Sequence, residues 1–381
     1  MLSLPSIDKI NIITHSEISP LSTNHKSNKI FIESYGMMYY NYIIIREIVY
    51  KNDSFLLKLI TTIEKIVHPN IQICYGITCD AKTNSQCIIL EYITALNLDE
   101  IYYLKYILSS KEEIMLKLKI ISLIAQTLSF LYNSDCPYLV LNSHSVKLNY
   151  KLLTDKHQHL KVIYCDNSYI ETNLIKFTQI GLYLKYVDNE VYNINDDSVY
   201  NVSYFSPGLV ELVRMNNERC LPCIDVLQQW DVWSFGCLVY EIFTGCKPYC
   251  EYYDDKGRLM EMIVQKEKYN QHWHVEGCDN LYKEVCMKVN EKIVERCIEG
   301  SIKDFNEMID IVNGIITEKK KEMFDESEVN DIKSKVSGLD FKSYHLPKFQ
   351  ELHLFDQEVA KSKELLTKID DVQKKINSLQ I

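Results

Sequence analysis

The stretch Asp231-Val-Trp-Ser-Phe-Gly-Cys-Leu-Val-Tyr-Glu-Ile-Phe-Thr-Gly-Cys-Lys-Pro-Tyr249 decides the fold of this chain. Apolar side chains lie on nearly every side of the helix that it predicts, so we expect this helix to be buried inside a domain. Asp231 is expected in the first turn, where a carboxylate suits the positive end of the helix dipole. Gly245 and Pro248 predict the end of the helix, because glycine accepts a left-handed cap and proline cannot continue a helix.

Length and composition limit the function classes. The chain has 381 residues, of which 46% are hydrophobic, enough for a substantial core in one large domain or two. Its formal net charge of -10 argues against nucleic acid or an anionic membrane surface as the main partner. The sequence shows neither a secretory signal nor an apolar run long enough to span a bilayer, so we expect a cytoplasmic location without membrane insertion.

Cysteine usage fits the same compartment. Thirteen cysteines without an export signal are typical of reduced cytosolic thiols. Cys220-x-x-Cys223 and Cys246-x-x-x-Cys250 could be read as a zinc site, but the spacing is loose and no histidine lies beside them. We therefore expect no metal.

Hydrophobic patterning predicts strands first and helices later. Lys29 to Tyr50 alternates in a way that suits paired strands, and Cys87 to Tyr92 predicts another strand. Ser54 to Val67 predicts a helix with Ser54 as its N-cap. Lys111 to Tyr132 carries a long helical pattern.

These elements resemble those of protein kinases. The stretch from Asp231 is similar to the central helix of the C-terminal lobe, and His68-Pro-Asn-Ile-Gln-Ile-Cys-Tyr-Gly76 resembles the turn and strand that follow helix C. The resemblance implies an α+β, bilobal protein kinase-like fold, with a β-rich N-lobe at about residues 29–92 and a helical C-lobe at about residues 93–318. The scaffold positions that the resemblance retains are Asp231, Trp233, Gly236 and Pro207.

Two flanking segments complete the predicted organisation. Residues 1–28 are polar and predict a mobile lead-in to the kinase-like domain at residues 29–318. Residues 319–381 predict a charged, C-terminal helical extension. Its last part has a short heptad seam, which either docks on its own domain or pairs two copies through residues 355–381. The seam consists of Leu365, Ile369, Val372, Ile376 and Leu379.

The residues that hold nucleotide in kinases are replaced. Phosphoryl transfer needs a glycine-rich cradle and a lysine paired with a glutamate of helix C. Gly36 is the single glycine before Gly76, so no cradle can be written. Arg46 occupies the place of the lysine and Leu59 that of the glutamate, which removes the ion pair.

The catalytic loop is replaced as well. The motif H-R-D-L-x-x-x-N corresponds to Val140-Leu-Asn-Ser-His-Ser-Val-Lys147, which puts Asn142 at the base and Lys147 at the magnesium-binding asparagine. An amide cannot take up a proton at neutral pH, and an ammonium repels a metal ion. A second register, which aligns His144 with the motif histidine, places Val146 and Lys151 at these positions. Neither register restores catalysis.

The later motifs also lack their charges. The D-F-G motif corresponds to Gln179-Ile-Gly181, and Asp166 is a rival candidate without a following Phe-Gly. The A-P-E motif reads Ser206-Pro-Gly208, and its later arginine partner is missing too, so neither half of that buried ion pair remains. Between these motifs, Ser198 and Ser203 are candidate phosphorylation sites.

The substitutions together predict a pseudokinase that is not an enzyme and needs neither ATP nor magnesium. Pro69-Asn-Ile-Gln-Ile-Cys-Tyr-Gly-Ile-Thr-Cys-Asp80 and Tyr204-Phe-Ser-Pro207 resemble the pseudokinase domain of the mixed lineage kinase domain-like (MLKL) family. That resemblance implies a partner, a receptor-interacting protein kinase of the necroptosis pathway.

The resemblance also suggests a direction of action. Too few residues precede the first strands for the four-helix bundle of that family. We therefore expect a viral homologue in the host cell cytoplasm that sequesters the kinase and inhibits necroptosis. The alternatives are a divergent, weakly active or nucleotide-binding kinase, and a scaffold that oligomerises through its C-terminal helix.

Overall fold

The structure is a computed structural model of the chain. It describes residues 18–20, 26–27, 31–38, 41–48, 59, 62, 66–80, 85–93, 96–99, 101, 109–139, 141–148, 174–178, 199–215, 221–266, 273 and 279–323.

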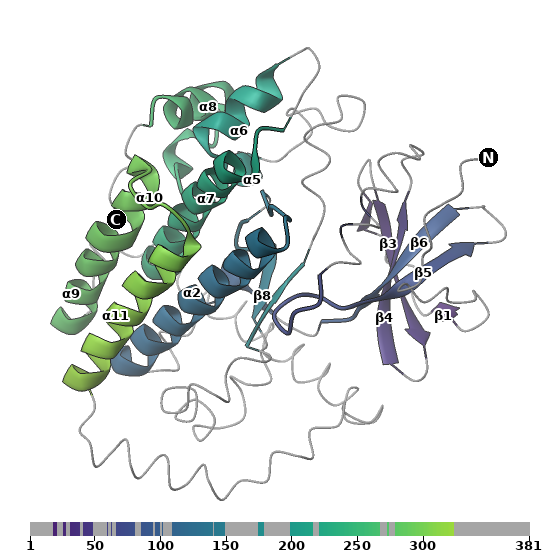
Figure 1. Cartoon of the computed structure of the whole chain (residues 1–381), viewed down its shortest axis with the longest axis horizontal. Helices are drawn as coiled ribbons and strands as arrows, with labels where there is room; N and C mark the ends of the chain where they lie inside the picture. The colour runs from purple at the N-terminus through teal and green to yellow at the C-terminus, as the bar shows by residue number, and fades with distance from the viewer. Residues whose placement is uncertain are drawn as a thin grey trace, which may run out of the picture. The chain divides into compact units, whose positions relative to one another are not determined.

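The first described strands form an antiparallel sheet in the order β1-β3-β4-β6-β5, with β2 paired to β3 (Figure 1). β3 (Phe31–Met38) and β4 (Asn41–Ile48) form a hairpin in the register Phe31↔Ile48 to Met38↔Asn41. β6 (Ser85–Glu91) pairs with both β4 and β5 (Cys74–Asp80). The strands predicted at Lys29–Tyr50 and Cys87–Tyr92 are confirmed.

β6 is buried on both of its faces. Ile88 and Leu90 join the main hydrophobic core, whereas Cys87 and Ile89 pack in a smaller cluster with Ile45. Side chains alternate across a strand, so the two clusters lie on opposite faces of the sheet. This explains why β6 is an uninterrupted apolar run.

The sheet extends into the predicted lead-in. β1 (Ile18–Pro20) and β2 (Lys26–Ser27) each pair antiparallel with β3. The prediction that residues 1–28 form only a mobile lead-in is therefore wrong for Ile18–Pro20 and Lys26–Ser27, which are strands of the sheet. Strands of two or three residues are too short to show alternation, which is why the sequence pattern missed them.

The helix predicted from Ser54 to Val67 is described at two positions. Leu59 and Thr62 have helical backbone, and Leu59 is 1% exposed. Residues 54–58, 60–61 and 63–65 of the predicted helix lie outside the described residues.

α2 (Ser110–Asn133) confirms the long helix predicted at Lys111–Tyr132. Ser109 begins it with a capping box, in which the Ser109 side chain accepts from the Glu112 backbone N–H and the Glu112 carboxylate accepts from the Ser109 N–H. Among the described helices, α2 alone has the length and composition of a membrane span, and 78% of that window is buried in the protein. Burial inside the domain accounts for its apolar character.

α7 (Ile224–Thr244) contains the stretch that decides the fold. The helix begins at Ile224, so Asp231 lies in its interior and the prediction that it occupies the first turn is wrong. Gly245, with φ of 72°, caps the C-terminal end in the left-handed conformation, as predicted. Trp233 is 3% exposed, in keeping with its scaffold role.

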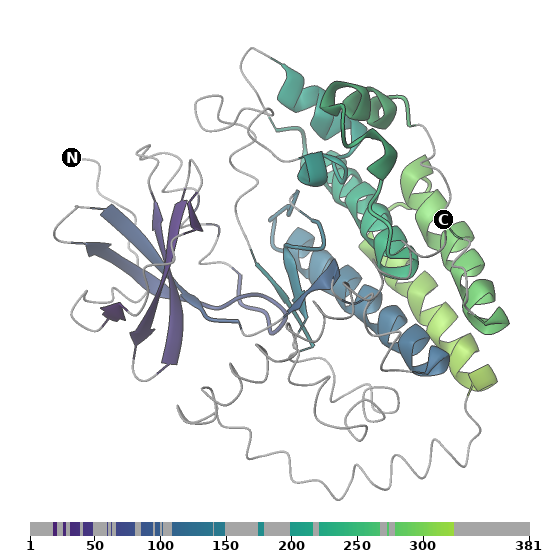
Figure 2. The ribbon, with the colours of Figure 1, turned by 180° about the vertical axis from the view of Figure 1, so that it is seen from behind.

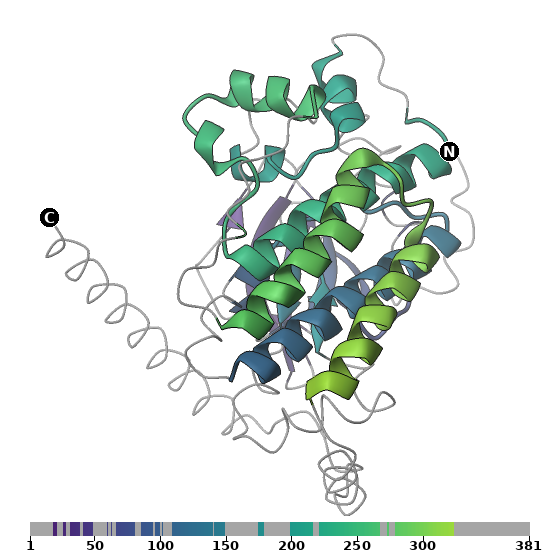
Figure 3. The same ribbon diagram turned by 90° about the vertical axis from the view of Figure 1, so that its left-hand side faces the viewer.

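α7 packs against α2, α6 and α10, and the structure describes further helices. Their bounds are α5 (Val199–Val202), α6 (Pro207–Arg214), α8 (Lys256–Val264), α9 (Asn280–Val289), α10 (Glu295–Glu299) and α11 (Phe305–Met323). A π-helical turn, η7 (Asn290–Val294), joins α9 to α10. α2 and α11 run side by side in Figures 1 and 3, and the Ser122 hydroxyl donates to Asn313 Oδ1 at 3.1 Å between them.

Gly236 sets the distance between α7 and α10. A Cβ atom built on Gly236 would lie 2.5 Å from Cys297 Cβ, closer than two side chains can approach. Glycine is therefore required here for helix packing rather than for backbone freedom.

One ion pair is buried among these helices. Lys117 of α2 is 1% exposed, and its Nζ lies 2.7 Å from Glu113 Oε1 and 2.7 Å from the Tyr282 hydroxyl. The ammonium also lies over the rings of Phe243 and Tyr282. A buried charge persists because it is paired and hydrogen-bonded.

Antiparallel strands β1–β7 precede α2, the short strands β8 and β9 follow it, and the described chain from α5 onward is helical, which is the α+β organisation that we predicted (Figure 2). The predicted C-terminal extension begins inside α11, which ends at Met323. The heptad seam and residues 355–381 lie outside the described residues.

Candidate functional site

A second, three-stranded sheet carries the segments that correspond to the catalytic motifs. β8 (Val146–Leu148) pairs antiparallel with β7 (Leu96–Asn97) on one side and with β9 (Ile175–Phe177) on the other. Residues 141–145 form the turn that leads into β8.

β9 is also bonded to the segment before β5. Phe177 accepts from the Gln72 N–H at 2.9 Å and donates to Asn70 O at 2.7 Å. Lys176 Nζ lies 3.1 Å from Glu91 Oε2, at the end of β6. These contacts fix β9 against the segment before β5 and the end of β6.

Asn142 organises the turn before β8. Its Oδ1 accepts from the backbone N–H groups of His144 at 2.8 Å and Ser145 at 3.0 Å. The backbone N–H of Asn142 donates to the Ser145 hydroxyl at 3.0 Å. The side chain is 7% exposed and acts as a turn cap, a role that an amide fills without proton transfer.

Lys147 is a strand residue, which changes the predicted alignment. It pairs with Asn97 and Lys176 in the middle of β8, and its Nζ donates to Asn97 Oδ1. The last turn residue is Ser145, whose carbonyl accepts from the Thr178 N–H at 2.9 Å, next to Gln179 in sequence. If the motif asparagine closes the turn, Ser145 takes its place and Val140 takes the place of the base, two residues before the predicted register.

The remaining predicted positions are described in part. Arg46 lies in β4 opposite Glu33 and Ile88, but its side chain lies outside the described part of the chain. Leu59, which the sequence interpretation places at the position of the helix C glutamate, is packed in the core. Gln179 and Asp166 lie outside the described residues.

Asp231 holds the backbone that enters the turn. Its Oδ2 accepts from the Tyr132 hydroxyl at 2.7 Å and the Tyr138 N–H at 2.8 Å, and its Oδ1 accepts from the Leu139 N–H at 2.8 Å. Leu139 has a φ of 54°, a conformation that needs support in a residue with a Cβ. Burial raises the pKa of Asp231 to about 6, although the three donors act in the opposite direction.

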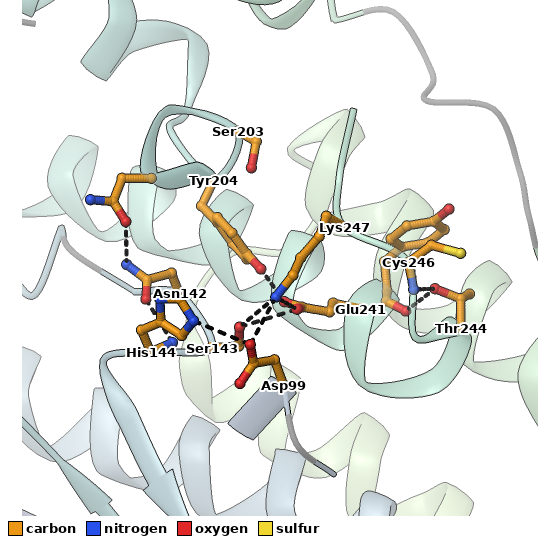
Figure 4. A network of polar contacts seen from close by, with 12 residues as sticks. Asp99, Asn142, Ser143, His144, Ser203, Tyr204, Glu241, Thr244, Cys246 and Lys247 are labelled. Carbon is orange, nitrogen blue, oxygen red and sulfur yellow. Dashed lines mark hydrogen bonds and ion pairs between the residues drawn. The ribbon is translucent and has the colours of Figure 1, made fainter. Parts of the chain in front are cut away.

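A polar network lies beside the turn (Figure 4). Lys247, just after α7, donates to Glu241, to Asp99 Oδ2 at 3.3 Å and to the Ser143 hydroxyl at 3.4 Å. Tyr204 donates to the other oxygen of Glu241. The network joins the turn, α7, the end of β7 and the segment before α6.

Two carboxylates in this network respond differently to it. Burial raises the pKa of Glu241, and the charge of Lys247 only partly offsets this. Burial also acts to raise the pKa of Asp99, but the hydrogen bond from His144 and the charge of Lys247 together hold it below its usual value. Asp99 is therefore ionised at neutral pH.

His144 and Asp99 form a partly exposed pair. His144 Nε2 lies 3.1 Å from Asp99 Oδ2, and the His144 side chain is 48% exposed. An imidazole held by a carboxylate is an arrangement that can accept a proton.

The Ser206-Pro207-Gly208 stretch forms the start of α6. Ser206 caps α6 by accepting from the Leu209 N–H at 3.2 Å, and Pro207 is the first helical residue, as suits its fixed φ. Ser203 is 0% exposed and its hydroxyl lies 3.1 Å from the Tyr253 hydroxyl, so a kinase cannot reach it in this conformation. Phosphorylation of Ser203 stays a prediction that requires this segment to move, and Ser198 lies outside the described residues.

The cysteines do not form a metal site in the part of the chain that the structure describes. Groups of three or more metal-ligating side chains are absent there. Cys223 and Cys250 are exposed thiols and Cys246 is partly buried. Cys220 lies outside that part.

The sequence interpretation missed Lys247 and Asp99. Glu241 offered a signal, because a carboxylate in a buried helix needs hydrogen-bond donors or a cationic partner nearby. Lys247 follows Glu241 by six residues in the stretch quoted above. Whether the Lys247 side chain reaches Glu241 depends on the left-handed cap at Gly245, which ends the helix between them.

A family comparison agrees with these features. The family described as protein tyrosine and serine/threonine kinase matches residues 46–299, more than half of the 381 residues. Individual curated proteins give no significant match. With its strands, its long α2, its buried α7 and the turn before β8, the chain belongs to the protein tyrosine and serine/threonine kinase family.

Proposed function

We propose that this chain is a non-catalytic member of its family, a pseudokinase that acts by binding another protein. One observation carries the proposal and does not depend on the alignment register. The sequence contains no aspartate or glutamate from Cys136 to Thr154, so neither the turn at residues 141–145 nor its flanks can supply a carboxylate base.

The geometry of the turn supports the same reading. The side-chain oxygen of Asn142 accepts hydrogen bonds from two backbone N–H groups. The Ser145 hydroxyl donates to the Asn142 carbonyl oxygen at 2.9 Å. Leu59 is buried where a glutamate would orient the nucleotide-binding lysine. These substitutions favour a chain that uses neither magnesium nor ATP.

The proposed partner is a receptor-interacting protein kinase of the necroptosis pathway. The support is the resemblance of Pro69–Asp80 and Tyr204–Pro207 to the mixed lineage kinase domain-like family. A pseudokinase that occupies such a kinase without being its substrate competes with the natural substrate. We propose that the chain acts in this way as a viral decoy in the host cell cytoplasm, and that it inhibits necroptosis.

A binding experiment tests the partner. Purified full-length chain is immobilised and offered recombinant receptor-interacting kinase domains, with an unrelated kinase domain as control. Two charge reversals map the surface, Glu211→Lys on α6 and Lys283→Glu on α9, because both side chains are exposed on separate helices.

We expect retention of the necroptosis kinase, loss of retention with one reversal but not the other, and protection of expressing cells from necroptosis. Equal retention of the unrelated kinase, or none of either, contradicts the decoy proposal while leaving the pseudokinase proposal intact. Reversal of both residues without effect places the interface elsewhere.

A second candidate is a divergent, weakly active kinase. The His144–Asp99 pair favours it, because it places a possible proton acceptor in the turn. Transfer of labelled γ-phosphate from ATP to generic protein substrates, in the presence of magnesium, tests this candidate. Transfer that is lost in both His144→Ala and Asp99→Asn would establish an enzyme and overturn the pseudokinase proposal.

A further inference from the structure

The outer face of α11 carries a recess of about 670 Å³. Its lining includes Gly314, Thr317, Glu318 and Lys321, which stand at positions i, i+3, i+4 and i+7 of the helix and are neighbours on its surface. Where two helices pack side by side, four residues of one helix surround a hole that receives a side chain of the other. The recess therefore has the geometry of a packing site for a second helix.

Gly314 has no packing role inside the described part of the chain. A Cβ atom built on Gly314 meets nothing within 4 Å, whereas Cβ atoms on Gly208 and Gly236 would overlap a neighbouring side chain. Glycine in a helix interior destabilises the helix by about 0.5 to 1 kcal/mol relative to alanine. The close approach of another helix is a reason for glycine here that the fold of a single copy does not supply.

The recess faces away from the core. Val312, Ile315 and Lys319 are buried on one side of α11, whereas Gly314 and Thr317 are exposed. Because an α-helix turns once in about 3.6 residues, these two groups lie on opposite sides of the helix. Within the part of the chain that the structure describes, the face with the recess is open to a partner.

Two opposite charges flank the recess. Asp310 and Lys321 are both exposed and lie about three helical turns apart on the same face of α11. Neither makes an ion pair within the described residues, although Glu318 beside them is paired with Lys288 of α9. The face thus presents an acidic group toward its N-terminal end and a basic group toward its C-terminal end.

A second α11 in antiparallel orientation matches this pattern. A twofold interface repeats each contact, so when Gly314 of one copy lies opposite Thr317 of the other, Asp310 lies opposite Lys321 at both ends. A parallel pair would instead place like charges beside each other, which is unfavourable. The missing side chain at Gly314 allows the two helix axes to approach closely.

We propose that the outer face of α11 binds a second copy of this chain, with the two α11 helices antiparallel and crossing at Gly314 and Thr317. The contacts are mostly polar, so the dimer forms and dissociates reversibly, unlike dimers with large apolar interfaces. The proposal concerns self-association and is independent of the proposed partner kinase. It also differs from pairing through residues 355–381, because it needs α11 alone.

Sedimentation velocity of the full-length chain over a series of concentrations tests the proposal. Three variants exchange the flanking charges: Asp310→Lys, Lys321→Glu and the double variant that carries both changes. Each single reversal sets like charges opposite each other at both ends of the helix pair, whereas the double reversal restores opposite charges. Glu211→Lys is the matched control, since it reverses an exposed charge on α6.

We expect the wild-type chain and Glu211→Lys to shift from monomer to dimer with the same Kd. Each single reversal should raise the Kd by about tenfold or more, and the double variant should recover most of the affinity. A wild-type chain that stays monomeric at every concentration overturns the proposal. A dimer that the single reversals leave unchanged also overturns it and places the contact elsewhere, with residues 355–381 as the next candidate.

Gly314→Gln separates association from folding. The glutamine side chain fills the recess and should abolish the dimer. The Tm of the monomer should equal or exceed that of the wild type, because glutamine favours helix more than glycine does. A Gly314→Gln chain that dimerises like the wild type contradicts the proposed crossing point. A lower Tm would give Gly314 a packing role inside one copy, which contradicts the proposal as well.

Discussion

A Cβ atom on Gly208 would lie 2.4 Å from Trp230 Nε1. The indole ring of Trp230, near the start of α7, packs directly on the backbone at the beginning of α6. In the sequence interpretation, Gly208 takes the place of the glutamate of the A-P-E motif. The Trp230 ring fills the space that a side chain at residue 208 would need, so the contact between α6 and α7 requires glycine here.

Gly208→Ala should lower the free energy of unfolding by about 1 to 3 kcal/mol, because the new methyl group overlaps a ring that cannot move aside easily. Gly314→Ala is the matched control, since Gly314 also lies in a helix and a Cβ there meets nothing within 4 Å. The control should be neutral or gain up to about 1 kcal/mol from helix propensity. Urea titration of both variants measures the difference in the free energy of unfolding. Equal stabilities would show that the Trp230 ring moves aside for the new methyl group.

Gly236→Ala should destabilise the packing of α7 on α10 by about 1 to 3 kcal/mol or more, since its Cβ would overlap Cys297 Cβ. Because the overlap is with Cys297 Cβ, removing that atom should restore the stability of Gly236→Ala. Cys297→Gly should restore most of the lost stability in the double variant, whereas Cys297→Ala should not, because alanine keeps the Cβ. Thermal unfolding of the four chains forms a double-mutant cycle. Rescue by Cys297→Ala would contradict the geometry.

Asp231→Asn should cost about 1 to 3 kcal/mol, because the amide nitrogen would face a backbone N–H or the Tyr132 hydroxyl where the carboxylate accepts a hydrogen bond. Asp231→Ala should cost more, since all three donors lose their acceptor. Denaturant unfolding at pH 7 measures both variants. An asparagine variant as stable as the wild type would mean that the donors are satisfied elsewhere.

The same residue predicts a pH dependence. The folded pKa of about 6 lies above the usual value near 3.9, so between about pH 4 and 6 the folded chain binds a proton that the unfolded chain lacks. The contribution of Asp231 to stability therefore increases as pH falls through this window. The stability difference between wild type and Asp231→Asn should be larger at pH 5 than at pH 7, and the subtraction cancels other titrating groups. A difference that shrinks at pH 5 contradicts the shift.

The buried Lys117–Glu113 pair predicts an asymmetry. Glu113→Ala leaves a buried ammonium without its carboxylate and should cost about 3 to 5 kcal/mol. Replacing both residues, with Lys117→Met and Glu113→Leu, should be close to neutral, because the double change removes both charges and keeps the volume. Equal losses for the single and double variants would show that the pair itself stabilises the fold.

Nucleotide binding gives a separate expectation. ATP with magnesium should leave the Tm of the wild-type chain unchanged, since Leu59 and the turn at residues 141–145 offer neither the glutamate nor the metal ligands. An active protein kinase treated in parallel verifies the assay. A magnesium-dependent rise in Tm would favour the nucleotide-binding alternative.

Motif wording and hydrophobic period were enough to predict the sheet, α2, α7 and the family. The 3.6-residue and two-residue periods are local properties, so β6 and α2 were found within a few residues of their bounds. The lack of a carboxylate around the turn is likewise visible in the sequence in any register.

The tertiary structure decided what depends on chain reversals and close approach. Asp231 was placed at a helix start by its sequence neighbours, whereas its actual role depends on Tyr132, Tyr138 and Leu139, which are far away in sequence. The sequence motif placed Lys147 in a loop, at the position of a metal-binding asparagine. The pairing of β8 with β9 shows that Lys147 is a strand residue.

The Lys247–Asp99 contact and the Gly208–Trp230 contact belong to the same class. Each joins residues of different elements, because tertiary packing and not local propensity brings them together. The sequence by itself therefore determined the family and the main elements, because motif wording and hydrophobic period are local properties. The tertiary structure alone decided which side chains from distant elements meet, because helix packing and strand pairing bring them together.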